Sequence, residues 1–203
     1  DDPRHGAEHE TIGSSSTAWV FALLVAIPWF WPFPTGPIKD FWSDWLAWAS
    51  FWLLLGLFPL WGARHARVLA MGWLVAALGN AAIAFIQYFD LENGMYPWVA
   101  YSLPGYPMGH LFQPNLLATL LVVGGWSLVW LSRDGLVSGR LGATMAVLLI
   151  AALASTASRS GAVLFLASLA MLVWWGRATP GRTWAAATAA AAVFVASALF
   201  LPY

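Results

Sequence analysis

The sequence predicts an all-α fold, a polytopic transmembrane helical bundle of about seven helices, and three observations support it. Of the 203 residues, 61% are hydrophobic and only 9% are charged, whereas a soluble domain carries about 25% charged residues. Long apolar runs approach the roughly 20 residues that a helix needs to cross a bilayer. Most connections between the runs are short, so consecutive helices are expected to be antiparallel neighbours.

The chain opens with a polar segment, residues 1–16, which predicts a disordered cytoplasmic tail. The transmembrane helical domain is then predicted to cover 17–203. It includes the first apolar run, because this run is too long for a signal peptide and no small-residue cleavage pattern follows it. The first residue is Asp rather than Met, so we expect these residues to be part of a longer chain. The apolar runs are 17–33, 41–61, 68–89, 115–132, 141–158, 161–175 and 184–201.

Basic residues predict the orientation, because positively charged loops stay in the cytoplasm. With the N-terminus cytoplasmic, the opposite side holds only Lys39 and Arg159. The connection 90–114 is then a loop on the outer side, which in a bacterial inner membrane is the periplasm. The basic residues on the cytoplasmic side are Arg4, Arg64, Arg67, Arg133, Arg140, Arg177 and Arg182.

Composition excludes several kinds of site. The 9 basic and 9 acidic residues cancel, so the chain lacks the basic surface that binds nucleic acid. It has no cysteine, which rules out disulfides and thiolate metal sites. Its four histidines lack the spacing of metal ligands, so we expect no metal site.

The loop 90–114 is rich in proline, glycine and aromatic residues, and segments of this kind are usually functional. Trp98 is placed to stack on a sugar ring, whereas the tryptophans of the first two helices suit an interfacial aromatic belt. His110 can titrate near neutral pH and act as a base, although a histidine in an exposed loop often has no such role.

Gln113-Pro114-Asn115 stands where this loop meets the next apolar run. Pro114 disfavours helix at Gln113 and is tolerated in a first turn, so a helix should begin near Asn115. The side chains of Gln113 and Asn115 would then face the outer water boundary beside a helix N-terminus, which is a natural anion site. Helix capping alone explains the same three residues equally well.

Arg159 is a lone charge between two apolar runs, among the polar residues Ser155, Thr156, Ser158 and Ser160. A charge at membrane depth needs an anionic partner or a wet cavity. The planar fork of arginine suits a phosphate or pyrophosphate. The alternative is a tight outer turn whose arginine reaches the lipid head groups.

Three further features concern packing. Gln87 and Asn80, toward the outer end of the third helix, are expected to bond neighbouring helices or to line the same polar cavity as Arg159. The alanine-rich segment 185–192 predicts close packing of the last helix against a neighbour.

Two motifs resemble those of a known superfamily. Gln113-Pro114-Asn115, followed by Leu117-Ala118 and an apolar helix, resembles the motif of bacterial O-oligosaccharyltransferases that glycosylate pilin. The stretch 156–161, Thr-Ala-Ser-Arg-Ser-Gly, resembles the Ser-Arg motif of the wider superfamily, which includes O-antigen ligases and O-antigen polymerases. The resemblance implies a glycosyltransferase that moves an oligosaccharide from undecaprenyl pyrophosphate to a periplasmic acceptor, without metal or other cofactor. The acceptor would be a protein Ser or Thr, as in pilin, or the lipid A-core.

The resemblance also implies roles for individual residues. Arg159 would bind the pyrophosphate leaving group and stabilise its charge as the glycosidic bond breaks, and Gln113 would position glycan or acceptor. Asn115 and Ser158 belong to the same motifs and are candidate substrate-binding residues. His110 and Trp98, in the adjoining loop, are added to that substrate-binding set.

The chain also departs from the pattern. Phe112 stands where the family often has glycine, and the family's essential histidine lies in a later periplasmic loop beyond Tyr203. These residues would be the N-terminal half of such an enzyme, and no general base is assigned, since His110 is not equivalent to that histidine. Two alternatives remain open: a transporter or flippase of an anionic lipid-linked substrate, and a non-catalytic membrane subunit that packs through its alanine-rich last helix.

Overall fold

The computed structural model describes residues 22–30, 63–96, 98–176 and 180–201. Within these ranges the chain forms helices, turns and connections and contains no strand, which confirms the all-α class for this part of the protein. The predicted tail 1–16 and the second apolar run, 41–61, lie outside the described residues. Of the first apolar run the structure describes residues 22–30, which end in the short 3-10 helix η1 (Ile27–Phe30).

The main helices of the described chain follow the predicted apolar runs. Three of them contain segments long and apolar enough to cross a membrane, namely Ala66–Tyr88, Pro114–Arg133 and Thr183–Phe200. The helices α5 and α6 are apolar but shorter, with 17 residues each. The helices are α3 (Ala63–Tyr88), α4 (Pro114–Arg133), α5 (Gly139–Ser155), α6 (Arg159–Trp175) and α7 (Pro180–Phe200), and the 3-10 helix η2 (Gly109–Leu111) precedes α4.

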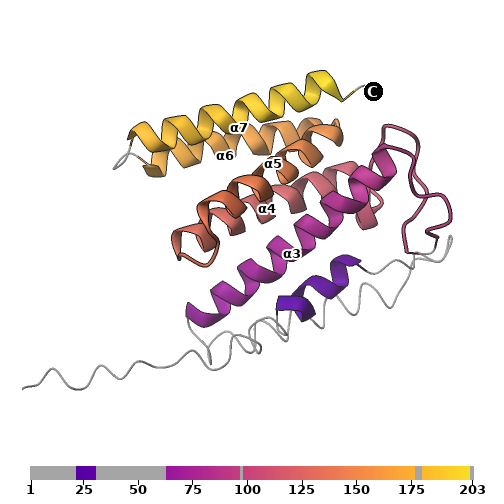
Figure 1. The fold of residues 1–203 in the computed structure, drawn as a ribbon, viewed down its shortest axis with the longest axis horizontal. Helices are drawn as coiled ribbons and strands as arrows, with labels where there is room; N and C mark the ends of the chain where they lie inside the picture. The colour runs from indigo at the N-terminus through magenta and orange to yellow at the C-terminus, as the bar shows by residue number, and fades with distance from the viewer. Residues whose placement is uncertain (1–21, 31–62, 97, 177–179, 202–203) are drawn as a thin grey trace, which may run out of the picture.

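Consecutive helices from α3 to α7 run antiparallel, and their connections are short except for the one between α3 and α4 (Figure 1). The helix α4 packs against α3, α5 and α6, while α7 packs against α5 and α6. One end of the bundle therefore gathers the last residues of α3, α5 and α7 and the first residues of α4 and α6. We call this the junction end; the connection from α3 to α4 lies there, on the right of Figure 1.

Small residues set the separation between α3 and α4. A Cβ at Gly124 of α4 would overlap the Cβ of Ala77 of α3, so the two backbones approach as closely as glycine permits. Ala77, Ala81 and Ala84 are buried along the same helix. The alanine-rich helix α7 is different, because Ala187 is buried while Ala185, Ala186 and Ala189 are exposed. It packs through one face only.

Close packing also joins α6 to α4 at the junction end. A Cβ at Gly161 would lie 2.7 Å from the Cβ of Ala118, so the first turn of α6 rests on the start of the second turn of α4. Our predicted bounds were wrong here by two or three residues: α5 ends at Ser155 and α6 begins at Arg159. The chain turns at 156–158, where Ala157 has a φ of 49°, and this left-handed conformation stops the helix.

Candidate functional site

Two helix N-termini form the candidate site, and both begin with the same backbone pattern. Gln113 is the N-cap of α4 and Ser158 is the N-cap of α6, each in an extended conformation. The preceding residues, Phe112 and Ala157, are left-handed, with φ values of 53° and 49°. The first amides of a helix have no acceptor inside the helix. Unsatisfied donors from α4 and α6 therefore lie at the same end of the bundle.

A single hydroxyl links the two predicted motifs. Ser158 Oγ donates a hydrogen bond to Asn115 Oδ1 at 2.8 Å, although the residues are 43 positions apart. The same oxygen accepts a hydrogen bond from the backbone nitrogen of Gly161 at 2.9 Å, and so caps α6. Ser160 Oγ lies 3.0 Å from it. We call this arrangement of Asn115, Ser158 and Ser160 the junction.

Gln113 is exposed, and its side chain makes no capping hydrogen bond. Its carbonyl oxygen instead accepts the backbone nitrogen of Leu117 at 3.1 Å, as the N-cap position requires. The predicted helix start near Asn115 is correct to one residue. Helix capping therefore accounts for the backbone of Gln113 and for Pro114, but it gives the Gln113 amide group no role.

Arg159 is the first residue of α6 and is exposed. The segment before it is a tight turn, so the alternative of a turn describes the backbone correctly, and the charge stands at a helix end rather than inside an apolar run. Within the described residues, Arg159 makes no salt bridge; the pair that does form, Arg67 with Asp134 at 3.4 Å, lies at the opposite end of the bundle. The guanidinium is thus available to an anion from solution.

Ser155 and Thr156 belong to the same predicted polar set, but both are buried and face away from solvent. Ser155 Oγ donates to the carbonyl oxygen of Ala152 at 2.8 Å, and Thr156 Oγ1 donates to that of Leu153 at 2.7 Å. Both hydroxyls satisfy carbonyl oxygens in the last turn of α5, where no further helical amides follow. They stabilise the turn, and only Ser158 and Ser160 contribute hydroxyls to the junction.

Gln87 holds the connection that leads into α4, a role that our two predicted roles for it did not include. The side chain is fully buried, and its Oε1 accepts the backbone nitrogens of Met108 and Gly109 at 2.9 and 2.8 Å. Its Nε2 donates to the carbonyl oxygens of Ala100 and Gly109 at 3.0 and 3.2 Å. One amide side chain therefore replaces the backbone pairing that an irregular segment lacks.

Asn80 holds the next residue of the same connection, His110, through its side-chain amide. Its Oδ1 accepts the backbone nitrogen of His110 at 3.0 Å, and its Nδ2 donates to the carbonyl oxygen of Trp29 at 3.0 Å. This contact draws His110 onto α3, where the residue is only 9% exposed. Our expectation of a histidine in an exposed loop was therefore wrong, because a buried asparagine holds the backbone of His110 inward.

Trp98 lies on the connection between α3 and α4 and is 68% exposed. Tyr96 and Tyr101, on either side of it in sequence, stack with ring centroids 6.2 Å apart and an interplanar angle of 7°. Both tyrosines are also exposed. The connection therefore presents flat aromatic surfaces, the kind of surface that the predicted stacking of Trp98 on a sugar requires.

Glu92 was not among our candidate site residues. It is 1% exposed, its Oε1 accepts the backbone nitrogen of Ser102 at 3.2 Å, and its Oε2 has no hydrogen-bond partner among the described residues. No pattern in the sequence distinguishes it from exposed acidic residues such as Asp90.

In the described chain, no three His, Asp or Glu side chains lie together as metal ligands would.

The described part of the chain is all-helical, with helices able to cross a membrane and with two joined helix N-termini at one end. No protein-family model matches the chain, and neither a curated protein nor a solved structure is significantly similar to it.

Proposed function

We propose that this protein is a membrane glycosyltransferase of the lipid-linked oligosaccharide transferase type. Its donor is an oligosaccharide on undecaprenyl pyrophosphate, and its acceptor is a periplasmic hydroxyl of a pilin-like protein or of the lipid A-core. It acts at the outer face of a bacterial inner membrane. The observation that carries the proposal is the hydrogen bond between Ser158 and Asn115, because it joins the two motifs that suggested this class.

The junction end offers the charge that a pyrophosphate needs. Helix N-termini attract anions through unsatisfied amides and through the helix dipole. Two such termini adjoin here, and Arg159 adds a full positive charge with a fork suited to phosphate oxygens. Among the described residues no carboxylate forms an ion pair with that charge.

The chemical step would transfer a sugar from the donor to an acceptor hydroxyl. The oxygen of the acceptor attacks the anomeric carbon, the bond between this carbon and the pyrophosphate oxygen breaks, and negative charge develops on the leaving group. Groups that bind this charge more tightly in the transition state than in the donor accelerate the reaction. Arg159 and the amides of the first turns would do so. The group that accepts the hydroxyl proton is not assigned to any described residue.

Gln113 would orient the reactants rather than exchange protons. A carboxamide offers two N–H donors and one oxygen acceptor and does not titrate, which suits hydrogen bonding to sugar hydroxyls. Its position beside the α4 terminus brings it near the junction. Trp98 would supply the aromatic face for a sugar ring further along the glycan.

The test is transfer in proteoliposomes that contain the undecaprenyl-pyrophosphate-linked oligosaccharide, with pilin and lipid A-core offered in separate reactions. Arg159→Ala is expected to reduce transfer about 100-fold or more, the loss typical of removing one group that stabilises developing charge. Arg140→Ala is the matched control, because Arg140 is an exposed arginine in the first turn of α5 at the opposite end. It should leave transfer unchanged.

The same experiment separates the alternatives. Movement of the lipid-linked glycan across the bilayer without any glycosylated product would favour a transporter. Glycosylated product at wild-type rates from the Arg159→Ala protein would exclude the proposed role of this arginine. Neither product nor movement of the glycan with the unaltered protein would favour a non-catalytic subunit.

A further inference from the structure

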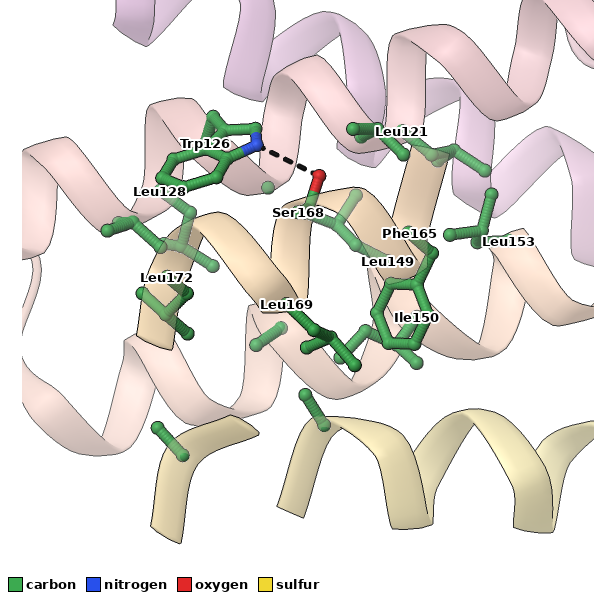
Figure 2. Close-up of a pocket in the computed structure, with 16 residues that line it drawn as sticks. Leu121, Trp126, Leu128, Leu149, Ile150, Leu153, Phe165, Ser168, Leu169 and Leu172 are labelled. Carbon is green, nitrogen blue, oxygen red and sulfur yellow. Dashed lines mark hydrogen bonds between the residues drawn. The ribbon is translucent and has the colours of Figure 1, made fainter. Parts of the chain in front are cut away.

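An apolar cavity of about 220 Å³ lies between α4, α5, α6 and α7 (Figure 2). Its lining is almost entirely aliphatic and aromatic, with one polar contact: Trp126 Nε1 donates to Ser168 Oγ at 3.0 Å. Figure 2 shows this bond across the space between α4 and α6. The lining side chains include Leu121, Leu153, Phe165 and Leu172.

The cavity begins beneath the junction and extends along the bundle. Phe165 follows the first residue of α6 by about 9 Å along the helix axis, and Leu172 follows it by about 20 Å. In α4, Leu121 lies about 10 Å from the helix start. Two aromatic pairs border this space: Phe165 stacks on Phe194 of α7, and Trp126 packs edge-to-face on Trp175.

The chemistry of the lining selects hydrocarbon. Apolar side chains offer no hydrogen bonds to water, and a closed cavity of about 150 Å³ lined by Leu, Ile and Phe stays dry and binds benzene. Its two polar groups, on Trp126 and Ser168, already bond each other and offer little to a sugar or a water molecule. An empty apolar cavity loses dispersion contacts, which a hydrocarbon chain restores.

We propose that this cavity binds the first segment of the isoprenoid chain of the lipid donor, directly below its pyrophosphate. The inference rests on the proposed function and adds to it a binding site for the lipid part of the donor. The position favours this occupant over the chain of a bulk phospholipid. Leu121 and Phe165 line the end of the cavity toward the first turns of α4 and α6, where the diphosphate would lie.

Gly125 provides a way to fill the cavity without moving the helices. It lines the cavity, and a Cβ built at this position meets no atom within 4 Å. The neighbouring Gly124 is the opposite case, because a Cβ there overlaps Ala77 and would separate α3 from α4. Gly125→Leu therefore occupies the space that the isoprenoid chain would take. Ala167→Leu is the matched control, since Ala167 is on the exposed face of α6 and does not line the cavity.

The experiment measures binding to the protein in phosphatidylcholine nanodiscs, with undecaprenyl pyrophosphate and inorganic pyrophosphate as separate probes. Gly125→Leu is expected to weaken the binding of undecaprenyl pyrophosphate at least tenfold and to leave that of inorganic pyrophosphate unchanged. Ala167→Leu should change neither. Arg159→Ala should weaken both. Undiminished binding of undecaprenyl pyrophosphate by Gly125→Leu would overturn the cavity assignment while the role of Arg159 stands.

A second measurement on the unaltered protein covers the case in which Gly125→Leu does not fold. A diazirine placed near the head of a polyprenyl pyrophosphate chain is expected to label peptides that contain 121–129 and 165–172. Labelling confined to other parts of the chain would overturn the inference. So would equal labelling of the same peptides by a diazirine phosphatidylcholine that undecaprenyl pyrophosphate does not displace. If the unaltered protein binds neither pyrophosphate probe, the proposed function fails, and this inference fails with it.

Discussion

The hydroxyl of Ser158 bonds the side-chain oxygen of Asn115 at 2.8 Å, and this contact fixes the start of α6 against the start of α4. Ser158 accepts from the amide of Gly161 at the same time, so one side chain both caps a helix and joins it to its neighbour. The close approach of Gly161 to Ala118 holds the same two helices together one turn further along α4. The geometry around Arg159 and Gln113 therefore depends on a few short contacts.

The first prediction concerns this contact. Asn115→Ala and Ser158→Ala should each lower the free energy of unfolding, by about 0.5–1.5 kcal/mol for the lost hydrogen bond, and Ser158→Ala by about 1 kcal/mol more for the lost cap. In a double-mutant cycle the coupling should be at least about 0.5 kcal/mol. Chemical denaturation in detergent measures it. Thr119→Ala is the control, because Thr119 bonds only the carbonyl oxygen of Asn115 in its own helix; additive effects of the two mutations would contradict the prediction.

The second prediction concerns Gln87. Gln87→Leu should destabilise the protein by about 2–4 kcal/mol, because it leaves several buried backbone groups of the connection without partners. Gln87→Glu keeps an acceptor but buries a carboxylate against the carbonyl oxygens of Ala100 and Gly109, so it should also destabilise the protein strongly. Limited proteolysis of the connection and thermal unfolding report the effect. A connection as resistant to protease as in the wild type would show that other contacts hold it.

The third prediction compares two glycines with positive φ. Gly109 has a φ of 59°, and a Cβ there would lie 2.8 Å from Asn80 Oδ1, whereas Gly94 has a φ of 80° and open space around it. Gly94→Ala should cost about 1–2 kcal/mol for the left-handed backbone alone. Gly109→Ala should cost more and should weaken the bond from His110 to Asn80. Equal losses in thermal stability would mean that Asn80 moves aside freely.

The fourth prediction separates charge from shape at Arg159. Arg159→Lys keeps the positive charge but loses the bidentate fork, so transfer should fall between that of wild type and that of Arg159→Ala. Unfolding temperature should stay unchanged in both variants, because the side chain is exposed. Initial rates at several donor concentrations measure the effect. Transfer by Arg159→Lys at the level of Arg159→Ala would assign the effect to the fork rather than to the charge.

The fifth prediction concerns Gln113. Because its side chain makes no capping bond, Gln113→Ala should reduce transfer while leaving helix content and unfolding temperature as they are. Circular dichroism and the transfer assay are measured on the same preparation. Wild-type transfer rates would show that Gln113 serves only to start helix α4.

The sequence alone determined the parts of this protein that depend on local chemistry. Long apolar runs predicted the main helices that the structure describes, and three of these helices are long enough to cross a membrane, where backbone groups must bond within their own segment. Pro114 predicted the start of α4 to within one residue, since proline lacks an amide proton and suits a first turn. The motifs around Gln113 and Arg159 were also visible, because polar residues at the ends of apolar helices stand out in such a composition.

Only the tertiary structure decided which of these residues meet. Three features depend on which faces of α3, α4 and α6 oppose each other. They are the bond from Ser158 to Asn115, the burial of His110 and the hydrogen bonds of Gln87 to the connection. That choice is made by small residues such as Gly124 and Gly161, whose close contacts lie far away in sequence. Hydrophobic pattern does not encode it, because in a bilayer both the lipid-facing and the buried faces of a helix are apolar.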